Sequence, residues 1–263
     1  MRPKSPAKVD YYWNVMKIDP TSYVSKSAAI GKNVEIGPYT IVHDNVEIGD
    51  NSKIGAFCEI GLQTTNAQSP KLFIGAESNI RSHSVFYAGS SFGHNLVTGH
   101  RVTVRENIEA GTDFQIGTLC DLQGSSKFGN YVKLHSSVHI GQKSTIEDFV
   151  WMFPYVVLTN DPHPPSNHLL GVTVSRFAVI ATMTTVLPGL NIGEGSLVGA
   201  HSLVTKNVNA NTVVAGSPAK YRGETKDILL DDKSGQAAYP WRFHFHRGYP
   251  TSLIDEWVIE SQQ

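Results

Sequence analysis

Five polar side chains in the middle of the sequence have the chemistry needed for proton transfer beside a reacting carbonyl group. They are His135, His139, Gln142, Asn160 and Asp161. A carboxylate or a neutral imidazole can take a proton from an attacking nucleophile near neutral pH, and an amide can donate a hydrogen bond to an oxyanion. The histidines and Asp161 are therefore candidate bases, and Asn160 is a candidate donor. Each of them alone could equally be a solvated surface group, so the fold must bring them together.

The elements that hold these side chains are predicted by an apolar residue at every sixth position. The longest run goes from Ile74 to Leu158, and fourteen of its fifteen positions are apolar. The same step runs from Ile30 to Ile60 and from Val174 to Ala210. A period of six does not fit the 3.6 residues of a helical turn, but it fits a short strand followed by a tight turn. The sequence predicts an all-β fold, a left-handed parallel β-helix with about nine coils of 18 residues.

Two other positions of the repeat have preferences of their own. Four residues after the apolar position the side chain is small or branched, and both Cys58 and Cys120 fall there. We therefore expect both cysteines to be core residues, without a disulfide or a cysteine zinc site. One residue after the apolar position Gly is frequent, as at Gly117 and Gly141, and we expect it to relieve the backbone of the turn.

Two insertions interrupt the repeat, near residues 61–73 and 159–173. Insertions in a solenoid form loops, often over the binding face. We expect a left-handed β-helix domain over residues 1–220 and an extension over 221–263. The extension contains a short helix at Thr251–Ser261, which either caps the β-helix or packs on a neighbouring chain.

A coil of 18 residues predicts which side chains lie above one another. Asn160 falls one coil above Gln142, and His139 falls one coil above Asp121. His139, Gln142, Asn160 and Asp161 thus gather in two adjacent coils beside the Pro-rich insertion. His135 lies on the preceding corner of the same coil, and a neighbouring chain could bring that corner into the same cleft.

Composition excludes several classes of protein. Lys and Arg number 22 against 23 Asp and Glu, so no basic surface for nucleic acid is expected. No run approaches the ~18 apolar residues of a membrane span. Residues Met1–Asp10 lack the apolar core of a signal peptide. We therefore expect a cytoplasmic protein that binds neither membranes nor nucleic acid.

A metal site is one alternative for the histidines. His100, His135 and His139 superficially resemble the zinc ligands of the γ-class carbonic anhydrases, which are also hexapeptide β-helices. Their separations of 35 and 4 residues do not fit, because that family places two ligands five apart. No metal is expected.

The run from Ile180 to Lys220, which ends in VVAGSPAK, resembles the closing coils of hexapeptide acyltransferases that use coenzyme A. The resemblance implies acetyl-CoA as a co-substrate. Its pantetheine arm would contact backbone near Ala181 and Ala200, and its phosphates would meet Lys206 and Lys220.

The middle of the chain, from NIRSHSVFYAGS to LTNDPHPPS, resembles the N-acetyltransferases of dTDP-3-amino-3,6-dideoxyhexoses. In those enzymes the TND segment, here Thr159 to Asp161, lies against the sugar amine. The resemblance implies a nucleotide-sugar substrate for surface glycan (lipopolysaccharide) synthesis and a homotrimer with its active sites between chains. One departure is Gln142: the resemblance implies that it occupies the position of the catalytic histidine of the lipid A acyltransferases, and a glutamine cannot act as a base.

Two alternatives stay open. The opening segment also resembles the acyltransferases of lipid A synthesis, which implies O-acyl transfer or transfer of a longer acyl chain. The other alternative is a non-catalytic or zinc-binding β-helix. Arg81, Arg101 and Arg105 are surface charges or phosphate contacts, and their spacing does not select a nucleotide.

Overall fold

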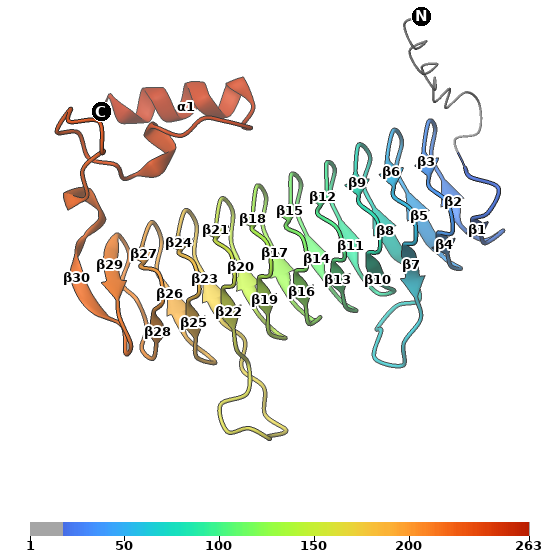
Figure 1. Cartoon of the computed structure of the whole chain (residues 1–263), viewed down its shortest axis with the longest axis horizontal. Helices are drawn as coiled ribbons and strands as arrows, with labels where there is room; N and C mark the ends of the chain where they lie inside the picture. Colours follow the sequence, from blue (N-terminus) through green and yellow to red (C-terminus); the bar gives the residue numbers. More distant parts are fainter. Residues whose placement is uncertain (1–17, 263) are drawn as a thin grey trace, which may run out of the picture.

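The computed structural model describes residues 18–262, and these form a left-handed parallel β-helix with an extension at its carboxyl end (Figure 1). The expectation that Met1–Asp10 is not a signal peptide concerns residues outside the described part of the chain. Successive short strands turn through three sheets, so that each strand pairs with the strand three places later in the sequence. The predicted fold class is confirmed.

The three sheets, named A, B and C, have eleven, ten and nine strands. Sheet A contains β3 (Glu35–Ile36), β6 (Lys53–Ile54), β9 (Asn79–Ile80), β12 (Val97–Thr98), β15 (Gln115–Ile116), β18 (Lys133–Leu134), β21 (Trp151–Met152), β24 (Val179–Ile180), β27 (Leu197–Val198), β29 (Thr212–Ala215) and β30 (Lys220–Glu224). Sheet B contains β1 (Tyr23–Val24), β4 (Ile41–Val42), β7 (Glu59–Leu62), β10 (Val85–Tyr87), β13 (Thr103–Val104), β16 (Asp121–Leu122), β19 (His139–Ile140), β22 (Val157–Leu158), β25 (Thr185–Val186) and β28 (Leu203–Val204). Sheet C contains β2 (Ala29–Ile30), β5 (Val46–Ile48), β8 (Leu72–Ile74), β11 (Ser91–Phe92), β14 (Glu109–Ala110), β17 (Lys127–Phe128), β20 (Thr145–Ile146), β23 (Thr173–Val174) and β26 (Asn191–Ile192).

The pairing register is the predicted one of 18 residues wherever no loop intervenes, as in Asp121 opposite His139. The β-helix begins earlier than the sequence pattern indicated, because β1 at Tyr23–Val24 already pairs with β4. Sheet B therefore has ten strands where about nine coils were expected.

The interior is filled by the apolar register and by small polar residues that bond to backbone. The apolar side chains of this register are almost completely buried, and Cys58 and Cys120 are only 2% and 1% exposed and free of disulfides, which confirms the core assignment. Ser78 and Ser144, in the small register, donate to the carbonyls of Gly75 and Gly141 at 2.7 and 2.8 Å. The buried hydroxyls are thus paired, as burial of a polar group requires.

The glycines that follow the apolar position have a different role from the one expected. Gly117 and Gly141 do not have the positive φ of a left-handed turn residue. A Cβ atom on Gly117 would lie 2.4 Å from the carbonyl carbon of His135 in the next coil. These positions therefore need glycine because adjacent coils approach closely there, and the prediction of a turn role was wrong.

The extension folds back along the side of the β-helix (Figure 1). After β30, which pairs antiparallel with β29, it forms two 3-10 helices, η1 (Thr225–Asp227) and η2 (Trp241–Phe243), and then α1 (Thr251–Ser261). Trp257 of α1 is 4% exposed and packs edge-on against Phe149 at 5.5 Å between ring centroids. The helix forms where it was expected, but it covers a side of the β-helix and does not cap its end.

A ladder of stacked rings receives the extension at the corner between sheets C and A. Tyr131, Phe149 and Phe177 stack with centroids 5.1 and 5.0 Å apart. All three have φ near +60°, a conformation that costs a non-glycine residue about 1–2 kcal/mol. Ring stacking, together with burial under Trp257, offsets that cost.

Candidate active site

Two loops project from the same corner of the prism, between sheets B and C (Figure 1). The first loop connects β7 to β8 through residues 63–71, and the second connects β22 to β23 through residues 159–172. The outer face of sheet B between these loops carries a row of polar side chains. This face is the candidate active site.

His139 and Asp121 form the central pair of this face. His139 Nδ1 lies 3.2 Å from Asp121 Oδ2, and each side chain is a little over one third exposed. Because an ionised carboxylate only accepts hydrogen bonds, Nδ1 must be the donor, which leaves Nε2 free as an acceptor that faces outward. The hydrogen bond from His139 holds the pKa of Asp121 below its ordinary value, and a second one from Gln123 adds to the effect although burial opposes both. A histidine oriented by a carboxylate is a suitable general base.

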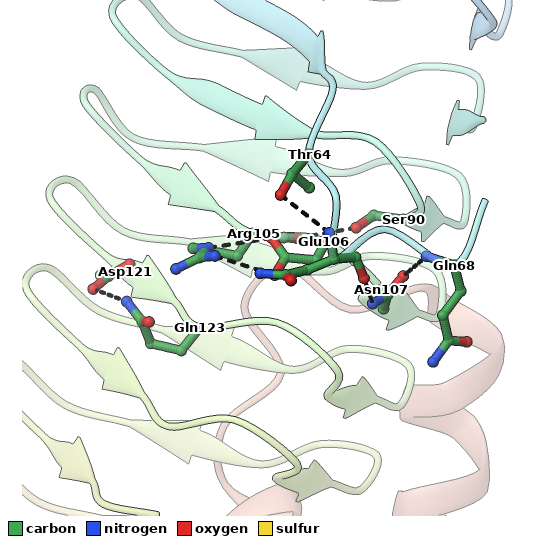
Figure 2. A network of polar contacts seen from close by, with 9 residues as sticks. Thr64, Gln68, Ser90, Arg105, Glu106, Asn107, Asp121 and Gln123 are labelled. Carbon is green, nitrogen blue, oxygen red and sulfur yellow. Dashed lines mark hydrogen bonds and ion pairs between the residues drawn. The ribbon is translucent and has the colours of Figure 1, made fainter. Parts of the chain in front are cut away.

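A second polar network joins this face to the first loop (Figure 2). Arg105 forms a two-pronged ion pair with the buried carboxylate of Glu106, at 3.2 and 3.1 Å. Asn107 donates to the carbonyl of Asn66 and accepts from the backbone N–H of Gln68, at 3.0 and 2.8 Å. The loop of residues 63–71 is therefore held in place by one amide side chain at its base.

Asn160 lies directly over Gly141 of the coil below. A Cβ atom on Gly141 would be 3.0 Å from the Cβ atom of Asn160, so only glycine fits there. Gly141 directly follows β19, which contains His139. Gln142 is half-buried at the same corner, in the predicted register below Asn160. The structure thus brings His139, Gln142 and Asn160 together in adjacent coils.

Asp161 stabilises the second loop, of which it is a part, by hydrogen bonds to the loop backbone. Its carboxylate accepts the backbone N–H groups of His163 and Ser166 at 3.0 and 2.9 Å, one on each oxygen. Partial desolvation acts to raise the pKa of this carboxyl, but the hydrogen bonds from Ser166 and His163 outweigh it and lower the pKa. Because both oxygens are engaged and the carboxylate is weakly basic, His139 is the stronger candidate base.

His135 does not join this group within one chain. It directly follows β18, at the corner between sheets A and B, where its ring stacks on Phe153 at 4.7 Å between centroids. Burial and the nearby charge of Lys133 lower the pKa of His135. The candidate bases predicted from sequence therefore lie at different places around the coil: His135 at the A–B corner, His139 on sheet B and Asp161 in the second loop.

The residues implied for coenzyme A also occupy two places. Lys206 and Lys220 line one cleft of about 360 Å³ at the carboxyl end of the β-helix. Ala181 and Ala200 lie at the corner between sheets A and B, where the N–H of Ala181 donates to the carbonyl of Val198 at 2.9 Å.

Among the described residues no group of three or more His, Cys, Asp or Glu side chains is placed to hold a metal ion. In the same part of the chain no helix is long and apolar enough to span a membrane.

Sequence reasoning did not select two features of these faces. Asp121 was noted only as the residue below His139, although the 18-residue register is itself a signal for the pair. The ion pair between Arg105 and Glu106 joins neighbouring residues, and nothing in the repeat distinguishes it from two unrelated surface charges.

Comparison with known proteins agrees with the fold and places acyltransferases and acetyltransferases among the similar proteins. Residues 27–62 match the family described as bacterial transferase hexapeptide (six repeats). A chloramphenicol acetyltransferase of Escherichia coli is 25% identical over 180 residues, which cover 65% of this chain and 78% of that protein. An acyl-[acyl-carrier-protein]--UDP-N-acetylglucosamine O-acyltransferase of Azorhizobium caulinodans is 28% identical over 135 residues, 51% of this chain and 47% of that protein.

Among solved structures, the Arabidopsis UDP-N-acetylglucosamine acyltransferase matches with a TM-score of 0.63 and 19% identity. The match covers 92% of this chain and 88% of that one, and it shows a shared fold. Over part of its length the chain is therefore similar to hexapeptide-repeat acyltransferases and acetyltransferases.

Proposed function

We propose that the protein transfers an acetyl group from acetyl-CoA to the amino group of a nucleotide-linked amino sugar, a dTDP-3-amino-3,6-dideoxyhexose, for surface glycan synthesis. The observation that carries acyl transfer is the His139–Asp121 pair on an open face between two loops, with Asn160 beside it. The amino sugar comes from the resemblance of the TND segment, and the acyl donor from that of the closing coils.

The chemistry assigned to the pair is general base catalysis. The acceptor nitrogen attacks the thioester carbonyl carbon, and its proton passes to Nε2 of His139. The negative charge of Asp121 stabilises the imidazolium that results. Asn160 donates its amide N–H to the oxyanion. The C–S bond then breaks, and coenzyme A leaves as a thiolate that takes up the proton.

The same geometry supports a homotrimer as the working state. His139 is 39% exposed in the single chain, and acyl transfer is favoured where water is excluded. A second chain placed against sheet B would close the site.

A hydroxyl acceptor is the second candidate function. The His139–Asp121 pair favours it, because a hydroxyl needs a base at neutral pH more than an amine does. The similarity to a UDP-N-acetylglucosamine O-acyltransferase points in the same direction. A longer acyl chain belongs to this candidate.

The test is thiol release from acetyl-CoA with matched acceptors that differ only in an amino or a hydroxyl group at the sugar 3-position. We expect thiol release with the amino sugar. Release only with the hydroxyl sugar, or only with a longer acyl-CoA, supports the second candidate. Absence of thiol release with every acceptor and donor would refute acyl transfer.

A further inference from the structure

A separate cleft of about 650 Å³ lies between sheet A and the C-terminal extension. Its walls include Trp151 of β21 and Phe245 and Arg247 of the extension, and its floor includes Gly99 and Gly117. The volume lies in the range of sites for small organic molecules.

The charges that line this cleft all have the same sign. Arg81, Lys133 and Arg247 line it together with His135, and none of the lining side chains among the described residues is acidic. An open cleft lined by one sign of charge concentrates ligands of the opposite sign.

Lys133 places a largely buried positive charge at this cleft. The residue is only 8% exposed, yet within the described chain its ammonium group has no hydrogen bond or ion pair. It is held over the rings of Trp151 and Tyr249, at 4.6 and 4.1 Å from their centroids. Aromatic faces compensate only part of the cost of removing an ammonium group from water. Its nearest opposite charge is Asp113, one coil away and not in contact.

We propose that this cleft binds a nucleoside diphosphate. Lys133 and the guanidinium groups of Arg81 and Arg247 bind the phosphates, since arginine matches phosphate oxygens with two parallel hydrogen bonds. The ring of Phe245, which is 37% exposed, offers a flat surface on which a base stacks.

Both substrates of the proposed reaction contain this group, since coenzyme A and a nucleotide sugar each include a nucleoside diphosphate. Assignment of the cleft to one of them rests on the proposed function, whereas the binding itself does not. The cleft and the His139–Asp121 pair lie on different faces of one chain, so a shared reaction needs a neighbouring chain.

Anion binding in the cleft is expected to depend on pH through Lys133. Burial lowers the pKa of Lys133 to about 8, although Asp113 opposes the shift. The other titratable groups beside it do not change charge near that pH, because the pKa of His135 is lowered and burial raises that of Tyr249. Affinity should therefore fall as the pH rises through about 8, when Lys133 loses its proton.

The test is calorimetric titration of the full chain at pH 7 with ADP, dTDP and inorganic pyrophosphate. We expect ADP or dTDP to bind at least tenfold more tightly than pyrophosphate. Lys133→Met and Arg247→Gln should each weaken that binding at least tenfold without loss of the folded state. The controls are Lys53→Met, an exposed lysine at the same outward position of sheet A, and Arg222→Gln, an exposed arginine on β30.

The proposal is overturned if neither nucleotide binds, if pyrophosphate binds equally well, or if the two cleft variants bind like the controls. Competition then identifies which substrate supplies the nucleoside diphosphate. Displacement of the bound nucleotide by coenzyme A assigns the cleft to the acyl donor. Displacement by a dTDP-sugar assigns it to the acceptor. If no acceptor ever releases thiol but the nucleotide still binds through Lys133 and Arg247, the proposed function fails and the cleft assignment stands.

Discussion

His139 and Asp121 belong to different coils, and each needs the other. Without the carboxylate, the imidazole would lose the hydrogen bond that fixes its tautomer and its orientation. Without the imidazole, Asp121 would have no group through which to act on a substrate. The 3.2 Å contact between them therefore gives a direct test of the proposed base.

We expect His139→Ala to lower kcat/KM for acyl transfer about 100-fold or more, which is the usual contribution of a general base. Asp121→Asn should lower it less, because the imidazole remains. Steady-state thiol release measures both. The matched control is His100→Ala, an exposed histidine whose Nδ1 contacts only Ser82. An unchanged rate in His139→Ala would remove this residue from the site.

Lys133 predicts an unusual response of stability to pH. Its pKa is lowered from 10.5 to about 8 in the folded chain, so the unfolded chain binds more protons between these values. The free energy of unfolding should therefore rise with pH across that window. Below pH 8 the folded chain carries the cost of a buried ammonium group.

Replacing Lys133 with Met removes this cost. We expect the free energy of unfolding at pH 7 to increase by about 1–2 kcal/mol, which is less than the full pKa shift implies because the cation–π contacts are lost as well. Urea unfolding at pH 7 and pH 9.5 measures the effect, and the difference between variant and parent should shrink at the higher pH. A destabilised variant at pH 7 would contradict the prediction.

At the scale of the elements, close stacking of the coils is the main constraint. A Cβ atom on Gly49 would lie 2.4 Å from the backbone nitrogen of Ala76. We expect Gly49→Ala to cost about 2–3 kcal/mol of stability, as overpacking of a tight site does. The control is Gly235→Ala, which meets no atom within 4 Å but has φ +75° and should cost only about 1 kcal/mol. Equal losses in thermal unfolding would show that close approach is not the constraint.

The first loop offers a second test at this scale. Asn107 holds the backbone at Asn66 and Gln68 through both ends of its amide. Asn107→Ala should speed hydrogen exchange of residues 64–68 at least tenfold while the second loop, held by Asp161, is unaffected. Slow exchange retained in the first loop would mean that other contacts fix it.

The sequence was sufficient to predict the repeating strands, but it was insufficient to predict the structure of segments that leave the repeat. The period of six determines which residues face inward, so it placed Cys58 in the core and His139 above Asp121. The role of Gly117 was misjudged because the period does not report how closely coils approach. The cleft at Lys133 could not be found, since Phe245 and Arg247 on one of its sides come from a segment more than 100 positions away that has no repeat of its own.

At the scale of the whole molecule, the two proposed sites lie on different faces of one coil. Lys133 is in β18 of sheet A and His139 is in β19 of sheet B. One chain cannot bring both faces to a single substrate, but a ring of three chains can place sheet A of one against sheet B of the next. We therefore expect sedimentation to give three times the mass of the chain.

Assemblies that mix two variants test whether neighbouring chains combine sheet A of one and sheet B of the next into one active site. Chains with His139→Ala and chains with Lys133→Met should each be inactive alone. When the two are unfolded and refolded together in equal amounts, about one quarter of the sites regain both residues if neighbouring chains supply them. The matched mixture of His139→Ala with His139→Ala/Lys133→Met should stay inactive. Failure of the first mixture to recover any activity would show that the two faces work separately.

The reversal of β30 has a consequence for how the protein behaves at high concentration. A stack of parallel strands has an open edge at its end, and a second molecule could add to that edge and start a filament. In this chain β30 runs antiparallel to β29 and occupies the edge of sheet A, so that an incoming parallel strand meets backbone of the wrong direction. The hairpin of β29 and β30 therefore acts against aggregation, because it hinders strand pairing between molecules at this edge of sheet A.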